Sequence, residues 1–283
     1  MDNRIKAGII SGLIAGIVIR SVVVLLAAFS LLNFLYFWIP SELPIMKIAM
    51  VEISIGIIWG IISGIIYSKI YDLIPGKSIL KAIIFGLGLY LILNIRFATL
   101  DVFYGWVTEA ISNLVQIYFW IIFGLVLGIS YEFLLGGYSV KKKKLKIIRS
   151  DIIKGIHLGG IAGFFGGVGV FILNIMIFNR ELYPYITDIG FLTGQMGAHA
   201  FFNLIWGIVI GIFFVMFYEK IPGRGISKGI AFSMIIFFLT SFLGAILSIA
   251  YGKPMVGYWS AFGGFTNFFI FGIIIGYLYK PTK

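Results

Sequence analysis

Long apolar stretches alternate along this chain with short polar segments. Eight of the stretches reach about 20 residues, the length an α-helix needs to cross a bilayer. They occupy residues 5–36, 48–71, 79–99, 111–135, 152–178, 196–218, 226–250 and 257–279. This pattern predicts an all-α integral membrane protein with eight transmembrane helices.

The second half of the sequence repeats the first at an offset of 147 residues. Residues 58–82 read IWGIISGIIYSKIYDLIPGKSILKA and residues 205–229 read IWGIVIGIFFVMFYEKIPGRGISKG, with 12 of the 25 positions identical. Each half holds four predicted spans, and an even number preserves direction across the membrane. We therefore predict two parallel four-helix repeats about a pseudo-two-fold axis along the membrane normal. Repeat one covers residues 1–140, a basic cytoplasmic linker covers 141–150, and repeat two covers 151–283.

Basic residues are distributed unequally between the two predicted membrane faces. The face that holds both termini carries 17 of the 22 lysines and arginines. Because cytoplasmic loops are enriched in Lys and Arg, we expect a multi-pass protein of the cell membrane with both termini in the cytoplasm. The net charge of +11 then reflects topology and anionic inner-leaflet headgroups, and it predicts no nucleic-acid partner.

Composition narrows the function classes further. Hydrophobic residues make up 60% of the chain and charged residues 12%, whereas soluble domains carry about 25% charged residues. The chain has no cysteine, which excludes disulfides, Cys-ligated zinc, iron–sulfur clusters and thiol catalysis. No zinc-protease, serine-hydrolase or paired intramembrane aspartate motif is present. We therefore expect no metal, no cofactor, no catalytic residue and no enzymatic activity.

Glycines recur every four residues in the first span and its counterpart. Gly8, Gly12 and Gly16 lie on one face of the first, and Gly155 and Gly159 begin the same pattern in the fifth. Small residues at this spacing let two helix backbones approach closely. The pattern favours tight helix packing, with a sliding seam between the halves as the alternative.

Two Pro-Gly turns occupy equivalent cytoplasmic loops, at residues 74–77 and 221–224. Proline and glycine end one helix and turn the chain into the next. The basic residues around these turns are predicted to contact anionic lipid headgroups, and they are Lys77, Lys81, Arg224 and Lys228. A nucleotide-binding loop is the alternative, but it would need a glycine where the first copy has Tyr71.

Charged and polar residues at membrane depth form the candidate binding site. Because a charge within a span is costly, it usually marks a partner or a pathway. The candidates gather toward the predicted outer half of the membrane, and they are Arg20, Glu52, Arg96, His199 and Asn203. Two interpretations remain open: a structural ion pair of Glu52 with Arg20 or Arg96, and an outward-facing polar cavity.

The repeat shows where the two copies differ at these positions. At the offset of 147, Glu52 corresponds to His199, and Arg20 corresponds to Gly167. The first copy thus carries charge that the second copy lacks.

The leading functional hypothesis is a permease or channel-like carrier for a small solute or ion, with a polar site in the outer half between the repeats. The alternative is a non-catalytic membrane scaffold or accessory subunit that packs through its glycine-rich faces. Besides the lipid bilayer, the partners compatible with this sequence are a second copy of the chain or another membrane subunit.

Overall fold

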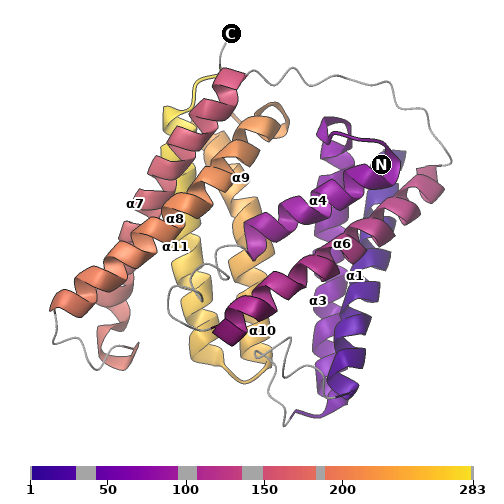
Figure 1. Cartoon of the computed structure of the whole chain (residues 1–283), viewed down its shortest axis with the longest axis horizontal. Coiled ribbons are helices and arrows are strands. Elements are labelled where there is room, and N and C mark those ends of the chain that lie inside the picture. Colours follow the sequence, from indigo (N-terminus) through magenta and orange to yellow (C-terminus); the bar gives the residue numbers. More distant parts are fainter. Residues whose placement is uncertain (1, 30–42, 95–106, 136–148, 183–188, 282–283) are drawn as a thin grey trace. The chain divides into compact units, whose positions relative to one another are not determined.

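The structure is a computed structural model of the 283-residue chain. It describes residues 2–29, 43–94, 107–135, 149–182 and 189–281. Within these ranges the regular elements are all helical (Figure 1). The α-helices are α1 (Asn3–Ala28), α3 (Ile45–Ile70), α4 (Ser78–Leu93), α6 (Val107–Leu135), α7 (Arg149–Leu182), α8 (Ile189–Phe217), α9 (Ile226–Phe237), α10 (Leu243–Ala250) and α11 (Pro254–Leu278). Short 3-10 turns, η1 (Tyr71–Leu73) and η2 (Tyr218–Lys220), follow α3 and α8, and a π-helical segment, η3 (Phe238–Phe242), joins α9 to α10.

Seven of the helical segments are long and apolar enough to cross a membrane. The prediction of an all-α, multi-pass membrane protein is therefore confirmed. The third predicted span, residues 79–99, coincides with α4, an apolar helix of 16 residues. Residues 95–106 lie outside the described part of the chain, so the eighth span stays a prediction.

The chain divides into two compact units. One consists of residues 1–145 and 246–254, and the other of residues 146–245 and 255–283. In the first unit α1 packs along α3, and α4 packs along α6; in the second, α7 packs along α8. The short segment 246–254, which the repeat assigns to the second half of the sequence, thus packs within the first unit.

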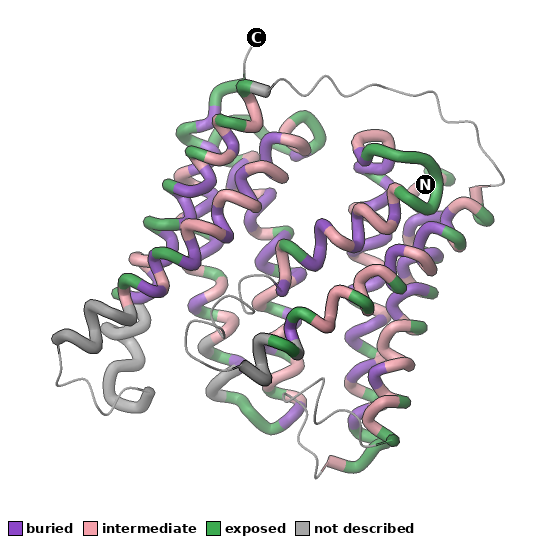
Figure 2. The backbone as a smooth tube through the Cα atoms, in the orientation of Figure 1, coloured by how far each residue is buried: buried purple, intermediate pink, exposed green. Residues whose placement is uncertain are grey.

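The glycine-rich faces form the closest helix contacts. A Cβ atom placed on Gly12 would overlap the carbonyl oxygen of Gly60, and one on Gly159 would overlap that of Gly207. The buried residues of α1 include Gly8, Gly12 and Gly16, whereas Ile10 is exposed. Buried and exposed positions alternate along the helices (Figure 2). The prediction of tight packing is confirmed, and in each unit the glycines serve contacts between helices of that same unit.

The two Pro-Gly turns adopt the same backbone conformation. Gly76 has φ +105° and Gly223 has φ +95°, the left-handed region that glycine enters without a Cβ penalty. Each glycine follows a 3-10 turn and precedes the next helix. The repeated sequence therefore builds the same helical hairpin in both units.

Candidate functional site

A buried ion pair joins α1 to α3 in the first unit. The Nη1 atom of Arg20 lies 2.7 Å from Oε2 of Glu52. Glu52 is 2% exposed and the Arg20 side chain is 21% exposed, so the carboxylate is withdrawn from solvent while part of the Arg20 side chain is not. This is one of the two pairings that the sequence predicts for Glu52. The other candidate partner, Arg96, lies outside the described residues.

The second oxygen of the Glu52 carboxylate is also occupied. The hydroxyl of Tyr251 donates a hydrogen bond of 2.5 Å to Oε1 of Glu52. Tyr251 follows the end of α10 and packs with Val23 and Ile48. Both carboxylate oxygens therefore have a donor, as a charge at this depth requires.

Sequence reasoning missed Tyr251. A tyrosine at the end of an apolar span is typical of the interfacial aromatic belt, and 199 residues separate it from its partner. One signal in the sequence could have found it. Tyr251 directly follows the predicted span 226–250, and this places its hydroxyl at the predicted membrane depth of the Glu52 carboxylate.

Gly56 makes the ion pair sterically possible. It lies one turn after Glu52 on the same face of α3, and a Cβ there would be 2.6 Å from Cγ of Arg20. The aliphatic stem of Arg20 thus lies over a position that only glycine leaves open. The large side chain of Arg20 on α1 therefore faces the small Gly56 on α3.

In the second unit the small residue lies on the first helix of the pair and the larger residue on the second helix. Gly167 on α7 stands at the position of Arg20, and Asn203 on α8 stands at that of Gly56. A Cβ on Gly167 would be 2.8 Å from Cβ of Asn203. The small residue and the large residue have changed places, and the helices stay close although neither of these two residues carries a charge.

Neutral hydrogen bonds replace the charges in the second unit. Asn203 is 1% exposed. Its Nδ2 atom donates to the carbonyl oxygen of His199 at 2.7 Å, and its Oδ1 atom accepts from Nδ2 of Asn267 on α11 at 3.0 Å. The structure thus brings His199 and Asn203 together in one unit, and Arg20 and Glu52 together in the other.

An amide cluster links α4 to α6 in the first unit. Asn94 donates to Oε1 of Gln116 at 2.6 Å and accepts from Nε1 of Trp120 at 2.9 Å. Gln116 in turn donates to Oδ1 of Asn113 at 3.3 Å. These polar groups satisfy one another, which suits helix association in an apolar medium.

The basic residues of the two Pro-Gly turns fall into two kinds. Lys81 donates to the carbonyl oxygen of Tyr71 at 2.7 Å, and Lys228 donates to that of Tyr218 at 2.6 Å. Each ammonium also lies over the ring of the same tyrosine, at 4.1 and 4.2 Å from its centre. A cation at the carboxyl end of a helix stabilises the free carbonyls there. The other two, Lys77 and Arg224, are exposed.

No protein-family model matches this chain, and searches of curated proteins and of solved structures also find no match. The chemistry of the described residues is therefore the basis for inferring a function.

Proposed function

We propose that this protein is a permease or channel-like carrier for a small solute or ion, and that the cluster of Arg20, Glu52 and Tyr251 belongs to its pathway. One observation carries the proposal: a buried carboxylate and an arginine, each on an apolar span, lie together with a tyrosine that directly follows another span. Charged residues within a span are costly to bury and typically mark substrate or ion pathways.

Comparison of the units separates this role from a purely structural one. The α7–α8 pair packs through the same glycine positions as the α1–α3 pair, with Gly167 and Asn203 where the first unit has Arg20 and Gly56. Helix pairing of this kind therefore does not need the ion pair. Because a well-packed neutral contact is often as stable as a buried ion pair, stability alone is a weak reason to keep the charges.

The accessory-subunit alternative relied on glycine-rich faces that contact a partner chain. Gly8, Gly12 and Gly16 of α1 instead contact the backbone of α3, and the α7 glycines contact α8. Those faces are thus engaged inside each unit, which favours the carrier over the accessory subunit.

We further propose the finer architecture predicted from the sequence: eight spans in two parallel repeats with cytoplasmic termini. Matched contacts support it. Tyr67 and Phe85 have ring centres 5.3 Å apart, and Phe214 and Phe232, at the equivalent positions, 5.4 Å. Because the chain lacks cysteine, single Lys77→Cys and Lys253→Cys variants test the orientation directly. A membrane-impermeant maleimide should label Lys253→Cys only from outside and Lys77→Cys only from inside, and labelling of both from one side contradicts it.

The transport proposal is tested in sealed proteoliposomes. The probes are urea and glycerol, followed by osmotic swelling, and K⁺, Cl⁻ and H⁺, followed with entrapped dyes. We expect at least one probe to cross faster than in protein-free vesicles, and Glu52→Gln to slow it by about tenfold or more, the effect of about 1.4 kcal/mol on a barrier. The matched control is Glu219→Gln, an exposed carboxylate, which should leave the rate unchanged.

Folding of each variant is checked by size-exclusion chromatography and melting before reconstitution. Where Glu52→Gln is unstable, Glu52→Asp keeps the charge and shortens the side chain, and should also slow transport. Wild-type flux equal to that of empty vesicles for every probe contradicts the proposal. Equal flux in folded wild type and Glu52→Gln contradicts the assigned pathway.

A further inference from the structure

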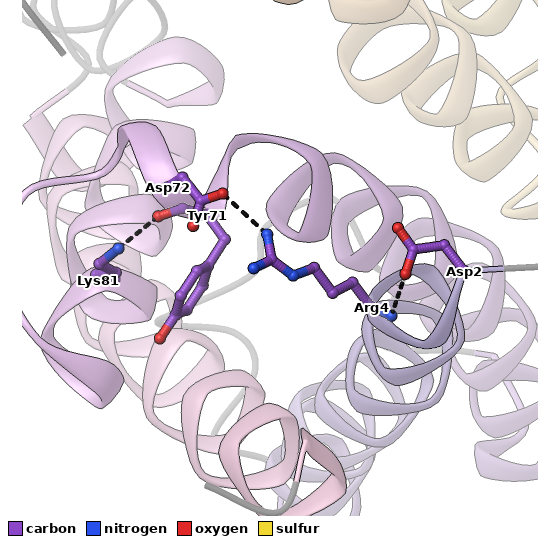
Figure 3. Close-up of polar contacts among 5 residues, drawn as sticks. All are labelled: Asp2, Arg4, Tyr71, Asp72 and Lys81. Carbon is purple, nitrogen blue, oxygen red and sulfur yellow. Dashed lines mark hydrogen bonds and ion pairs between the residues drawn. The ribbon is translucent and has the colours of Figure 1, made fainter. Parts of the chain in front are cut away.

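A second polar cluster lies at the end of the first unit that holds the N-terminus (Figure 3). Nη1 of Arg4, in the first turn of α1, lies 2.9 Å from Oδ2 of Asp72 in η1. The hydroxyl of Tyr71 donates to Oε1 of Glu132, on α6, at 2.5 Å. Two carboxyl groups and one guanidinium are thus held where three elements of the unit meet.

Three buried oxygens beside these pairs have no hydrogen-bond partner among the residues that the structure describes. They are the hydroxyls of Tyr67 and Tyr131 and Oδ1 of Asp72. Both tyrosines are 0% exposed. Buried polar groups are nearly always paired, because leaving one unpaired forfeits its hydration with no compensation. Because the described residues leave these oxygens without a partner, the oxygens are available to bind an occupant.

The three oxygens belong to side chains that pack in one region of the first unit. The ring centres of Tyr67 and Tyr131 are 5.1 Å apart, and those of Tyr71 and Tyr131 are 5.2 Å apart. The Tyr131 hydroxyl lies within electrostatic reach of Arg4 and Asp72.

Aromatic packing does not require the Tyr67 hydroxyl. Phe214 occupies the equivalent position in the second unit and is also 0% exposed. It contacts Tyr279 at 5.6 Å, where Tyr67 contacts Tyr131 at 5.1 Å. The same contact thus forms with and without this oxygen. Since phenylalanine fills the position without an unpaired hydroxyl, packing alone does not account for tyrosine in the first unit.

We propose that Tyr67, Asp72 and Tyr131 bind a small monovalent cation such as Na⁺ or K⁺. Each supplies an oxygen lone pair, the ligand type that hard cations take. The carboxylates of Asp72 and Glu132 are balanced by two cations, Arg4 and Lys81, and Lys81 lies within electrostatic reach of both carboxylates. The cluster therefore has no excess of positive charge that would repel a monovalent cation.

Charge also argues against a divalent ion. Divalent sites such as those of Ca²⁺ typically gather several carboxylates, and among the described residues no group of three or more His, Cys, Asp or Glu side chains could hold a metal. The guanidinium of Arg4, which is paired with Asp72, also repels a bound cation, and it repels a divalent ion more strongly than a monovalent one. The cluster shares no residue with the Arg20–Glu52 pair, so this inference does not depend on the proposed carrier function.

The test compares the melting temperature of the purified full-length protein in NaCl, KCl and choline chloride at equal ionic strength. Choline is too large for a site of this kind and controls for screening. A bound ion at about ten times its dissociation constant should raise the melting temperature by about 3 °C over choline. We expect this rise for Na⁺ or K⁺ in wild type.

The matched variants place at each of the equivalent positions 67 and 214 the residue that the other unit has there. Tyr67→Phe should abolish the ion-specific rise, and Phe214→Tyr should retain it. Tyr131→Phe, which also keeps the ring, should abolish it as well and serves if Tyr67→Phe does not fold. Identical melting in all three salts overturns the proposal and indicates a neutral occupant such as water. An unchanged rise in both folded Tyr67→Phe and Tyr131→Phe overturns it too, because the ion would then bind elsewhere.

Discussion

Replacing Glu52 by glutamine isolates the charge of the buried pair from its shape. Glutamine keeps a side-chain oxygen that can accept from Tyr251, so the main change is the loss of attraction to Arg20. The Nη1–Oε2 distance is 2.7 Å. Charge centres about 4 Å apart attract by about 4 kcal/mol at an effective dielectric constant of about 20.

Two effects reduce the net loss below that figure. The carboxylate is 2% exposed, so Glu52→Gln also removes its unfavourable desolvation. The Arg20 side chain is 21% exposed and can recover part of its hydration. Breaking a fully buried pair costs about 3–5 kcal/mol, and we therefore expect Glu52→Gln to lower the free energy of unfolding by about 2–3 kcal/mol.

A double-mutant cycle tests the electrostatic origin of this loss. In the Glu52→Gln background, Arg20→Met removes the positive charge that faced Glu52 and keeps an unbranched side chain over Gly56. Neutral replacement of a whole buried pair is often close to neutral in stability, so the Arg20→Met/Glu52→Gln protein should unfold within about 1 kcal/mol of wild type. The assay is equilibrium unfolding in mixed micelles, followed by tryptophan fluorescence. A loss below about 0.5 kcal/mol in Glu52→Gln, or a double variant no more stable than Glu52→Gln, refutes the reasoning.

Three further changes are read as unfolding free energies in the same assay. Tyr251→Phe removes a hydrogen bond to a charged group and should cost about 1.5–3 kcal/mol, whereas Tyr258→Phe, at a residue that is 59% exposed, should cost nothing measurable; equal effects would contradict the Tyr251–Glu52 contact. Gly12→Ala forces a methyl group against the α3 backbone and should cost about 2–3 kcal/mol, while Gly197→Ala, which meets nothing within 4 Å, should be neutral or stabilising by up to about 1 kcal/mol; a neutral Gly12→Ala would exclude the close packing. Lys81→Met loses the bond to a helix-end carbonyl and the contact with an aromatic ring, and should cost about 1 kcal/mol, so an unchanged stability would favour a role at lipid headgroups alone.

Equivalent positions in the two repeats show which contacts the repeated sequence could predict. The offset of 147 aligns Lys81 with Lys228, and both make the same contact with the preceding 3-10 turn. Sequence reasoning assigned both to headgroups, because charge pattern reveals that a lysine lies near a membrane surface and not which oxygen it contacts. The same offset correctly marked Arg20 and Glu52 as departures from the second copy.

The sequence by itself determined the helical membrane class, because about 20 consecutive apolar residues can satisfy their backbone in lipid only as a helix. It also indicated the close glycine contacts, since spacing along one helix sets which residues share a face. Only the tertiary structure decided that Tyr251 completes the Glu52 site, and that the hydroxyls of Tyr67 and Tyr131 are buried without a partner among the described residues. Those contacts join residues far apart in the chain, and no periodicity encodes which distant side chains meet once the helices pack.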